Sequence, residues 1–328
     1  MDRTKVAGVL LRLRPDVRVI RRDADTWGLE RAGTVAWLPA ALVDAVWTRP
    51  DLLVGPLADV LSRLGFLESS IGNGDEPEGP DRNEVFASTL CDGHGARALR
   101  ILAERHYVVV GCGGIGSGAA IELAALGARR LTLIDGDRVV HSNRNRLLWS
   151  MPGDVGELKV EALASYLGSR FGTDVRAVGR DASEGLLHDL YGAAGPSLST
   201  WLLTVDQADA ARGVAGWLHG RSGVQYVHAG YSGARCAVGP FVGDAPDPCP
   251  FCGSRQWRLS TERFVAPSAA PNNLLIASFL AAQLLIAGAD PGATALRARR
   301  WVLDLRTGDV DFAVVEKQSD CEVCRIER

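Results

Sequence analysis

Long runs of positive charge, apolar runs of membrane-spanning length and internal repeats are all missing from this chain of 328 residues. The formal net charge is −3 and no segment is rich in lysine and arginine, which argues against non-specific binding to nucleic acid or to a membrane surface. The most apolar run, Leu274 to Ala289, is shorter than the roughly 20 residues that a membrane span needs. It contains Ser278 and Gln283, so a buried helix is expected there. No signal-peptide pattern opens the chain, and a cytoplasmic protein is expected.

Cysteine is scarce, and its seven residues are an odd number for a secreted disulfide framework. Four of them form two C-x-x-C pairs, Cys249/Cys252 and Cys321/Cys324. Two such pairs supply the four thiolates that Zn²⁺ prefers in a closed structural site. A structural zinc is therefore predicted, with a redox pair or unpaired buried thiols as the alternatives. Cys112, in a glycine-rich turn, is expected to be a packing residue.

Residues 1–70 are expected to form a small separate unit. Short strand-like runs at Val17–Arg22, Trp27–Glu30 and Val35–Leu38 precede two helix-like segments, Ala41–Trp47 and Val54–Leu67. A β-meander followed by two helices indicates a winged-helix-like α+β module. Residues 71–80 lie in a segment rich in glycine, proline and acidic residues, which is typical of a linker.

Residues 81–328 have an α/β pattern. Strands are expected at Tyr107–Val110, Arg130–Ile134 and Trp201–Val205, and helices at Ser117–Leu126 and Lys159–Phe171. Because strands and helices alternate, the fold class predicted is a doubly wound, Rossmann-like and mostly parallel sheet.

A glycine-rich turn lies between the first of these strands and the first helix. Its glycines are Gly111, Gly113, Gly114 and Gly116. Glycine lets the backbone approach a phosphate or ribose, and the helix N-terminus that follows favours anions. About twenty residues later, at the end of the next strand, Asp135 can accept hydrogen bonds from ribose hydroxyls. On this evidence alone a nicotinamide-binding oxidoreductase and an ATP-binding enzyme are equally good interpretations.

The next segment separates these two interpretations. Residues 135–146 read DGDRVVHSNRNR and are followed by Gly156-Glu157-Leu158-Lys159. They resemble the D-x-D-x-V-x-x-S-N-x-x-R and G-x-x-K motifs of the ThiF and ubiquitin-activating enzymes. The resemblance covers about residues 81–328 and implies an ATP-dependent adenylyltransferase, in which arginine and lysine neutralise the leaving pyrophosphate.

The resemblance also implies individual roles. Arg146 and Lys159 are expected to bind phosphates, whereas Asp135, Asp137 and Asn143 are expected to bind the nucleotide. Asp206, in Thr204-Val205-Asp206-Gln207 where the family has T-D-N, is expected to coordinate Mg²⁺. The alternative for Asp206 is a helix N-cap. Val205 and Gln207 depart from the family pattern at this point.

A further arginine suggests a dimer. Residues 81–86, DRNEVF, resemble the family segment whose arginine reaches the ATP of the partner subunit, so Arg82 is a candidate catalytic residue in a homodimer. The alternative is a solvated charge at the start of a domain. No cysteine occurs between Cys252 and Cys321, so a thioester relay of the ubiquitin type is not expected.

The N-terminal module resembles the leader-peptide-recognition modules of enzymes that make ribosomal peptide natural products. The nearest resemblance is to the microcin C-type adenylyltransferases. It implies that the module binds a precursor peptide and that ATP, Mg²⁺ and a structural Zn²⁺ serve the adenylation of a carboxyl-type group of that peptide.

Two alternatives stay open. One is an activator of a ubiquitin-like sulfur carrier, which the extra module argues against. The other is a catalytically silent scaffold that presents leader peptides to a partner cyclodehydratase. Such a scaffold should have lost the glycines or the phosphate-binding cations, which this sequence retains.

Overall fold

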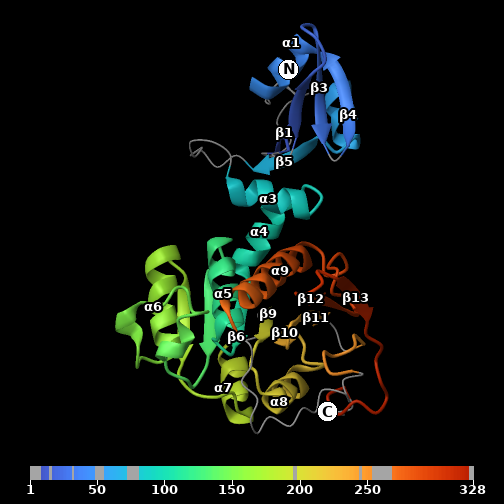
Figure 1. Cartoon of the computed structure of the whole chain (residues 1–328). Helices are drawn as coiled ribbons and strands as arrows, with labels where there is room; N and C mark the ends of the chain where they lie inside the picture. The colour runs from blue at the N-terminus through green and yellow to red at the C-terminus, as the bar shows by residue number, and fades with distance from the viewer. Residues whose placement is uncertain are drawn as a thin grey trace. The chain divides into compact units, whose positions relative to one another are not determined.

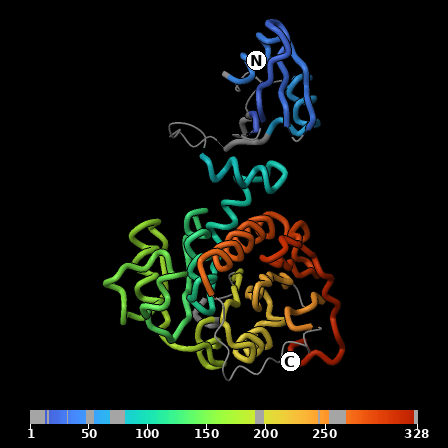
Figure 2. The backbone as a smooth tube through the Cα atoms, viewed as in Figure 1, coloured from blue at the N-terminus to red at the C-terminus, as the bar shows by residue number. Residues whose placement is uncertain are grey.

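The computed structural model describes residues 9–324 except 15–16, 32, 49–54, 72–80, 195–197, 244–245 and 253–267. The chain divides into two compact units, Met1–Leu99 and Arg100–Arg328, and the boundary falls within helix α4 (Gly95–Glu104). Figures 1 and 2 colour both units by position in the sequence. The domain limits expected from composition stay a prediction, and most of the expected linker lies outside the described residues.

The N-terminal unit contains two small antiparallel sheets and short helices. The first sheet has the order β2-β3-β4, with strands at Arg18–Arg21, Thr26–Arg31 and Thr34–Pro39. The second pairs β1 (Val9–Leu13) with β5 (Leu67–Ile71). The helices are α1 (Ala40–Thr48), α2 (Pro56–Arg63) and α3 (Arg82–Leu90). Leu29, Val43 and Phe66 are fully buried in its core, so a small α+β unit is present as predicted.

The helix expected at Val54–Leu67 is shorter than predicted. Gly65 has a φ of +77°, and the amide of Phe66 donates to the carbonyl of Leu61 at 2.8 Å. This left-handed glycine and its 6→1 hydrogen bond end α2, as in a Schellman motif. Leu67 begins a strand instead. The periodic apolar residues before Gly65 gave no sign of this stop.

The C-terminal unit is built on an eight-stranded sheet with the order β13-β12-β11-β10-β9-β6-β7-β8. Its strands are β6 (His106–Val110), β7 (Arg130–Ile134), β8 (Asp174–Val178), β9 (Ser199–Leu203), β10 (Val224–Ser232), β11 (Arg235–Val242), β12 (Arg299–Asp304) and β13 (Val310–Val314). Strands β8, β7, β6, β9 and β10 pair in parallel, and the last three pair antiparallel. The predicted doubly wound, mostly parallel sheet is therefore present.

Helices cover both faces of this sheet. One face carries α5 (Gly114–Ala125), α6 (Lys159–Phe171) and α9 (Ala270–Ala289). Helix α5 contacts both α6 and α9, and Figure 1 shows α9 alongside α5. The other face buries α7 (Glu184–Ala194), α8 (Ala208–Leu218) and the four C-x-x-C cysteines in one apolar cluster. Helix α6 begins and ends where the sequence predicted. Helix α5 begins three residues earlier than expected, within the glycine turn itself.

Helix α9 is long and apolar enough to cross a membrane by length and composition alone. In this fold, 61% of its most apolar window is buried inside the protein. Gly118 of α5 lies against α9, where a Cβ at this position would stand 3.0 Å from that of Ala277. Such close packing is that of a core helix, as the sequence predicted for Leu274–Ala289.

Candidate functional site: a nucleotide loop and a four-cysteine cluster

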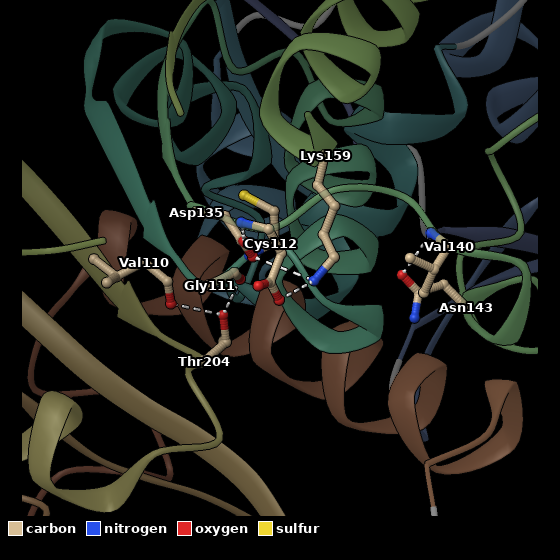
Figure 3. A network of polar contacts seen from close by, with 9 residues as sticks. Val110, Gly111, Cys112, Asp135, Val140, Asn143, Lys159 and Thr204 are labelled. Atoms are coloured by element: carbon tan, nitrogen blue, oxygen red, sulfur yellow. Dashed lines mark hydrogen bonds and ion pairs between the residues drawn. The ribbon is translucent and has the colours of Figure 1, made fainter. Parts of the chain in front are cut away.

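The glycine turn lies where the strand order reverses. Strand β6 stands between β7, which follows it in the chain, and β9, which arrives later by a crossover. In open α/β sheets, ligands bind outside the carboxyl ends of the strands at such a switch point. Three segments meet there: the glycine loop after β6, Asp135–Asp137 after β7, and Thr204–Asp206 after β9. Figure 3 shows the residues that connect them.

Three of the four predicted glycines are required by close packing. Gly111 has a φ of +93°, and a Cβ on it would lie 2.8 Å from the Val205 amide nitrogen. A Cβ on Gly114 would lie 2.6 Å from Cγ of Asn273, and one on Gly116 only 1.9 Å from the Gly111 carbonyl oxygen. Gly113 differs, because nothing lies within 4 Å of the position of its Cβ. The loop is therefore tightly packed from behind and open at Gly113.

Asp135 holds the loop from the β7 side. Its Oδ2 accepts the Cys112 amide at 2.7 Å, and its Oδ1 accepts the Asp137 amide at 2.8 Å. Burial raises the pKa of this carboxyl above its usual 3.8, against the nearby Lys159 and these amides, which lower it. The carboxylate is thus fixed in orientation beside the start of α5.

The side chain of Lys159, the first residue of α6, points towards Asp135 and Asp137. Its side chain is only 9% exposed, and its Nζ lies 2.7 Å from Asp137 Oδ2 and 3.9 Å from Asp135 Oδ2. Figure 3 shows the ammonium group directed towards Asp135 and the loop. A cation held this way is positioned before any ligand arrives, which is what stabilisation of developing negative charge requires.

Asp206 is exposed beyond the end of β9. The N-cap of α8 is Gln207, which makes no side-chain capping hydrogen bond. The N-cap alternative for Asp206 is therefore not what the structure shows. Its carboxylate is available at the same edge of the sheet as the glycine loop.

Two other predicted residues are held locally. Asn143 is buried, and its Oδ1 accepts the Val140 amide at 3.4 Å within its own turn. Arg146 donates to the carbonyl of Ser142 at 3.1 Å and to Oδ1 of Asn145 at 3.0 Å. In Figure 3, Asn143 stands apart from the Asp135–Lys159 network. The structure therefore does not bring these two side chains into the cluster around Lys159.

Arg82 is exposed as the first helical residue of α3, in the N-terminal unit. Its proposed action across a dimer stays a prediction.

Sequence reasoning missed two residues that shape the loop. The Thr204 hydroxyl donates to the Gly111 carbonyl at 2.6 Å, and buried Asn273 of α9 packs against Gly114. Asn273 Nδ2 donates to the Ala269 carbonyl at 2.6 Å. Thr204 belongs to the same sequence segment as Asp206, but no partner for its hydroxyl could be predicted from the sequence. Asn273 follows the loop by more than 150 residues, and only the fold brings it there.

The two C-x-x-C pairs come together on the opposite face from α5 and α9. The four Sγ atoms lie within 4.8 Å of one another. Contacts between them are 3.7 Å for Cys249–Cys252, 3.5 Å for Cys249–Cys321 and 3.4 Å for Cys252–Cys324. These distances are too long for disulfides, whose sulfurs are about 2.05 Å apart. A tetrahedral zinc with bonds of about 2.3 Å places its sulfurs about 3.8 Å apart. The donor set and its spacing therefore fit zinc.

A half-buried arginine supports this cluster. Arg300 of β12 donates to the carbonyl of Pro250, which lies between Cys249 and Cys252. Burial lowers the pKa of the Arg300 guanidinium, whereas Cys249 and Cys252 raise it. Four thiolates around a divalent ion would leave a net negative charge. The positive charge of Arg300 lies beside this cluster and offsets part of that charge.

The chain resembles parts of several known proteins in sequence. It is 44% identical to the tRNA threonylcarbamoyladenosine dehydratase of Escherichia coli (strain K12) over 74 residues, 23% of this chain and 28% of that protein. It is 33% identical to the adenylyltransferase and sulfurtransferase MOCS3-1 of Zea mays over 110 residues, 32% of this chain and 24% of that protein. The chain thus matches only about a quarter of the length of these relatives.

Likeness to solved structures extends over nearly the whole chain. The E. coli MccB structure with ATP has a TM-score of 0.69 at 18% identity, covering 96% of this chain and 99% of that chain. MccB with MccA-N7isoASN has a TM-score of 0.70 at 18% identity and the same coverage. The PaaA structure has a TM-score of 0.65 at 19% identity, covering 93% of this chain and all of that one. At these identities the likeness concerns the fold.

The family follows from the sequence profile. The ThiF family profile matches residues 88–323, well over half of the chain, and includes the glycine loop, Lys159, Asp206 and the first three clustered cysteines. This chain belongs to the ThiF family.

Proposed function

We propose that this protein is an ATP-dependent adenylyltransferase that activates a carboxyl-type group of a ribosomally made precursor peptide. The observation that carries the proposal is the buried Lys159 beside Asp135 at the switch point, where Asp135 also accepts the Cys112 amide of the glycine loop. A nicotinamide enzyme needs no buried cation there, since hydride transfer leaves no large negative charge on phosphate. Adenylation does, because pyrophosphate leaves.

Each part of the site has a place in this reaction. Amides at the start of α5 and Lys159 bind phosphates, Asp135 accepts the ribose hydroxyls, and Asp137 and Asn143 support the loop that follows β7. Arg146 is proposed to turn from its present partners towards the phosphates. Asp206 suits Mg²⁺, which prefers carboxylate oxygen and neutralises phosphate charge. A substrate carboxylate oxygen then bonds to the α-phosphorus as the bond from that phosphorus to pyrophosphate breaks.

The ion pair of Lys159 with Asp137 suggests how the site accepts its ligand. Asp137 is 74% exposed, so solvent already screens its attraction for the ammonium group. An incoming phosphate carries more charge and can replace Asp137 as the partner of Nζ. Lys159 needs no large movement for this exchange.

The N-terminal unit is proposed to bind the precursor peptide. Strands β2 and β4 are the outer strands of its three-stranded sheet among the described residues. An extended peptide can add to such an edge as another strand. Structures of the similarly folded MccB include complexes with MccA, which supports a peptide substrate here. A homodimer, with Arg82 acting on the partner's ATP, belongs to the same proposal.

One alternative has an observation in its favour. The similarity to MOCS3-1, named an adenylyltransferase and sulfurtransferase, favours the same chemistry on a ubiquitin-like sulfur carrier. The N-terminal unit favours the peptide, because the family profile begins only at residue 88 and leaves most of that unit unexplained. The silent-scaffold alternative is opposed by the retained Lys159, Asp135 and glycine loop.

The experiment offers the purified protein ATP, Mg²⁺ and, in separate reactions, peptides encoded by neighbouring genes or a sulfur-carrier protein ending in Gly-Gly. Mass spectrometry then identifies any adenylylated product. Adenylylated peptide supports the proposal. Adenylylated carrier alone moves the substrate to the alternative, and peptide binding without ATP binding leaves only the scaffold.

A further inference from the structure

Thr204 joins the two segments that the proposed reaction needs side by side. It is the first residue after β9, and its amide continues the sheet by donating to the Val110 carbonyl at 2.9 Å. Its hydroxyl lies within donating distance of two carbonyls, that of Gly111 at 2.6 Å and, less closely, that of Val110 at 3.1 Å. Figure 3 shows this side chain directed at the Val110–Gly111 segment. Asp206 follows Thr204 by two residues in the chain.

The Gly111 carbonyl has little freedom to find another donor. Gly111 is fixed on its other side, where its amide donates to the Ile134 carbonyl of β7 at 2.9 Å. A Cβ on Gly116 would stand 1.9 Å from this carbonyl oxygen and 2.5 Å from Thr204 Oγ1. The first turn of α5 therefore closes over the oxygen, and a buried acceptor without a donor is costly.

Position 205, between Thr204 and Asp206, carries valine, which has no hydroxyl. The Val205 amide lies 2.8 Å from where a Cβ of Gly111 would be, so this backbone is already in close contact with the loop. The hydroxyl at this part of the chain is supplied one residue earlier, by Thr204.

We infer that Thr204 is a positioning residue, whose hydroxyl holds the glycine loop in its nucleotide-binding conformation and in register with Asp206. The inference rests on the proposed function, since it assigns Thr204 to the same ATP site. Loss of the hydroxyl leaves the enclosed Gly111 carbonyl without this donor, so the loop must shift to satisfy it and the direction of the loop amides that follow changes. Both the affinity for ATP and the alignment with Asp206 then suffer.

The test compares Thr204→Val, which keeps the shape but removes the donor, with Thr204→Ser, which keeps the donor. Thr173→Val is the matched control, because the Thr173 hydroxyl also donates to a backbone carbonyl, that of Ala128 at 3.3 Å, and is buried. Amide hydrogen exchange of residues 111–116 reports on the loop without nucleotide. Titration with ATP·Mg²⁺ and thermal unfolding report on binding and on general stability.

Thr204→Val is expected to speed exchange in the loop and to weaken ATP·Mg²⁺ binding about tenfold. Thr204→Ser should restore both, and Thr173→Val should change neither, although it lowers the melting temperature by a similar amount. Unchanged loop exchange in Thr204→Val overturns the inference, whether or not ATP binds. Equal effects of Thr204→Val and Thr173→Val on binding also overturn it. Failure of the wild type to bind ATP, with loop exchange still altered in Thr204→Val, counts against the proposed function instead.

Discussion

At the scale of single residues, the site places one carboxylate and one ammonium group where water has little access, and a second carboxylate in solvent beside them. Asp135 and Lys159 have side chains that are 10% and 9% exposed, whereas Asp137 is largely in solvent. Lys159 therefore compensates the buried charge of Asp135, whereas its ion pair with the exposed Asp137 can be broken at little cost. This asymmetry is useful for a cation that must exchange its partner for a phosphate.

Replacing Lys159 with alanine is expected to reduce peptide-dependent turnover about a hundredfold or more, because the charge of the leaving pyrophosphate loses its preorganised partner. The free energy of unfolding should decrease by about 1–3 kcal/mol, since Asp135 is left buried without a cation. Turnover assays and urea unfolding measure the two effects. Arg170→Ala, at the exposed end of the same helix, is the control and should change neither. Equal activity of the two variants would contradict the assigned role.

Asp135→Asn separates stability from function. Because folding raises the pKa of Asp135, the native state binds more protons than the unfolded chain between the two pKa values. The stability of the wild type therefore falls as pH rises through that window, whereas the asparagine variant lacks this dependence. The melting temperature of Asp135→Asn relative to wild type should rise from pH 4 to pH 7, while ATP affinity falls. A difference in melting temperature that stays constant with pH would show that folding does not raise the pKa of Asp135.

At the scale of elements, the sequence predicted those helices and strands whose limits depend on residues within or next to the element. Helix α6 was predicted within its observed limits, and it stops at Gly172, which has a φ of +69°. Strand β7 was also predicted as observed. Strands β1 and β5 were not foreseen, because they pair across more than 50 residues and nothing local records that pairing. Asn273 escaped notice for the same reason.

The glycine loop shows which part of the site a motif can and cannot give. The motif identified all four glycines, but only packing distinguishes those that serve the fold from the one that faces open space. Gly113 has a φ of −70°, which alanine also adopts.

Gly113→Ala should therefore leave the free energy of unfolding nearly unchanged and weaken ATP binding, because its methyl group occupies space proposed for phosphate. Gly116→Ala should lower the unfolding free energy by about 1–3 kcal/mol, since its Cβ overlaps the Gly111 carbonyl. Urea unfolding and nucleotide titration of both variants check this. If Gly113→Ala bound ATP as well as wild type, phosphate could not lie against that glycine.

At the scale of the whole molecule, the cysteine cluster joins segments that are far apart in the sequence. Cys249 and Cys252 follow β11, whereas Cys321 and Cys324 follow β13, and the cluster continues the core beneath α7 and α8. Spacing alone predicted this assembly. The sequence could not show that Arg300 would approach the Cys249–Cys252 turn from a neighbouring strand.

Cys324→Ser should lose most of the bound metal and several kcal/mol of stability, because metal binding at such a site contributes directly to folding. Cys236→Ala is the control, since Cys236 is buried in β11 but lies outside the cluster. Metal analysis and thermal unfolding of both variants check the prediction. Full metal content in Cys324→Ser would mean that the four thiols do not form one site.

The most direct test of the whole account is pyrophosphate release from ATP·Mg²⁺ by the purified full chain, with and without candidate precursor peptides, for wild type and Asp206→Ala. The account predicts release that depends on one peptide and is lost in the variant, although both proteins fold equally well. Release that ignores the peptide, or that survives in Asp206→Ala, would contradict it.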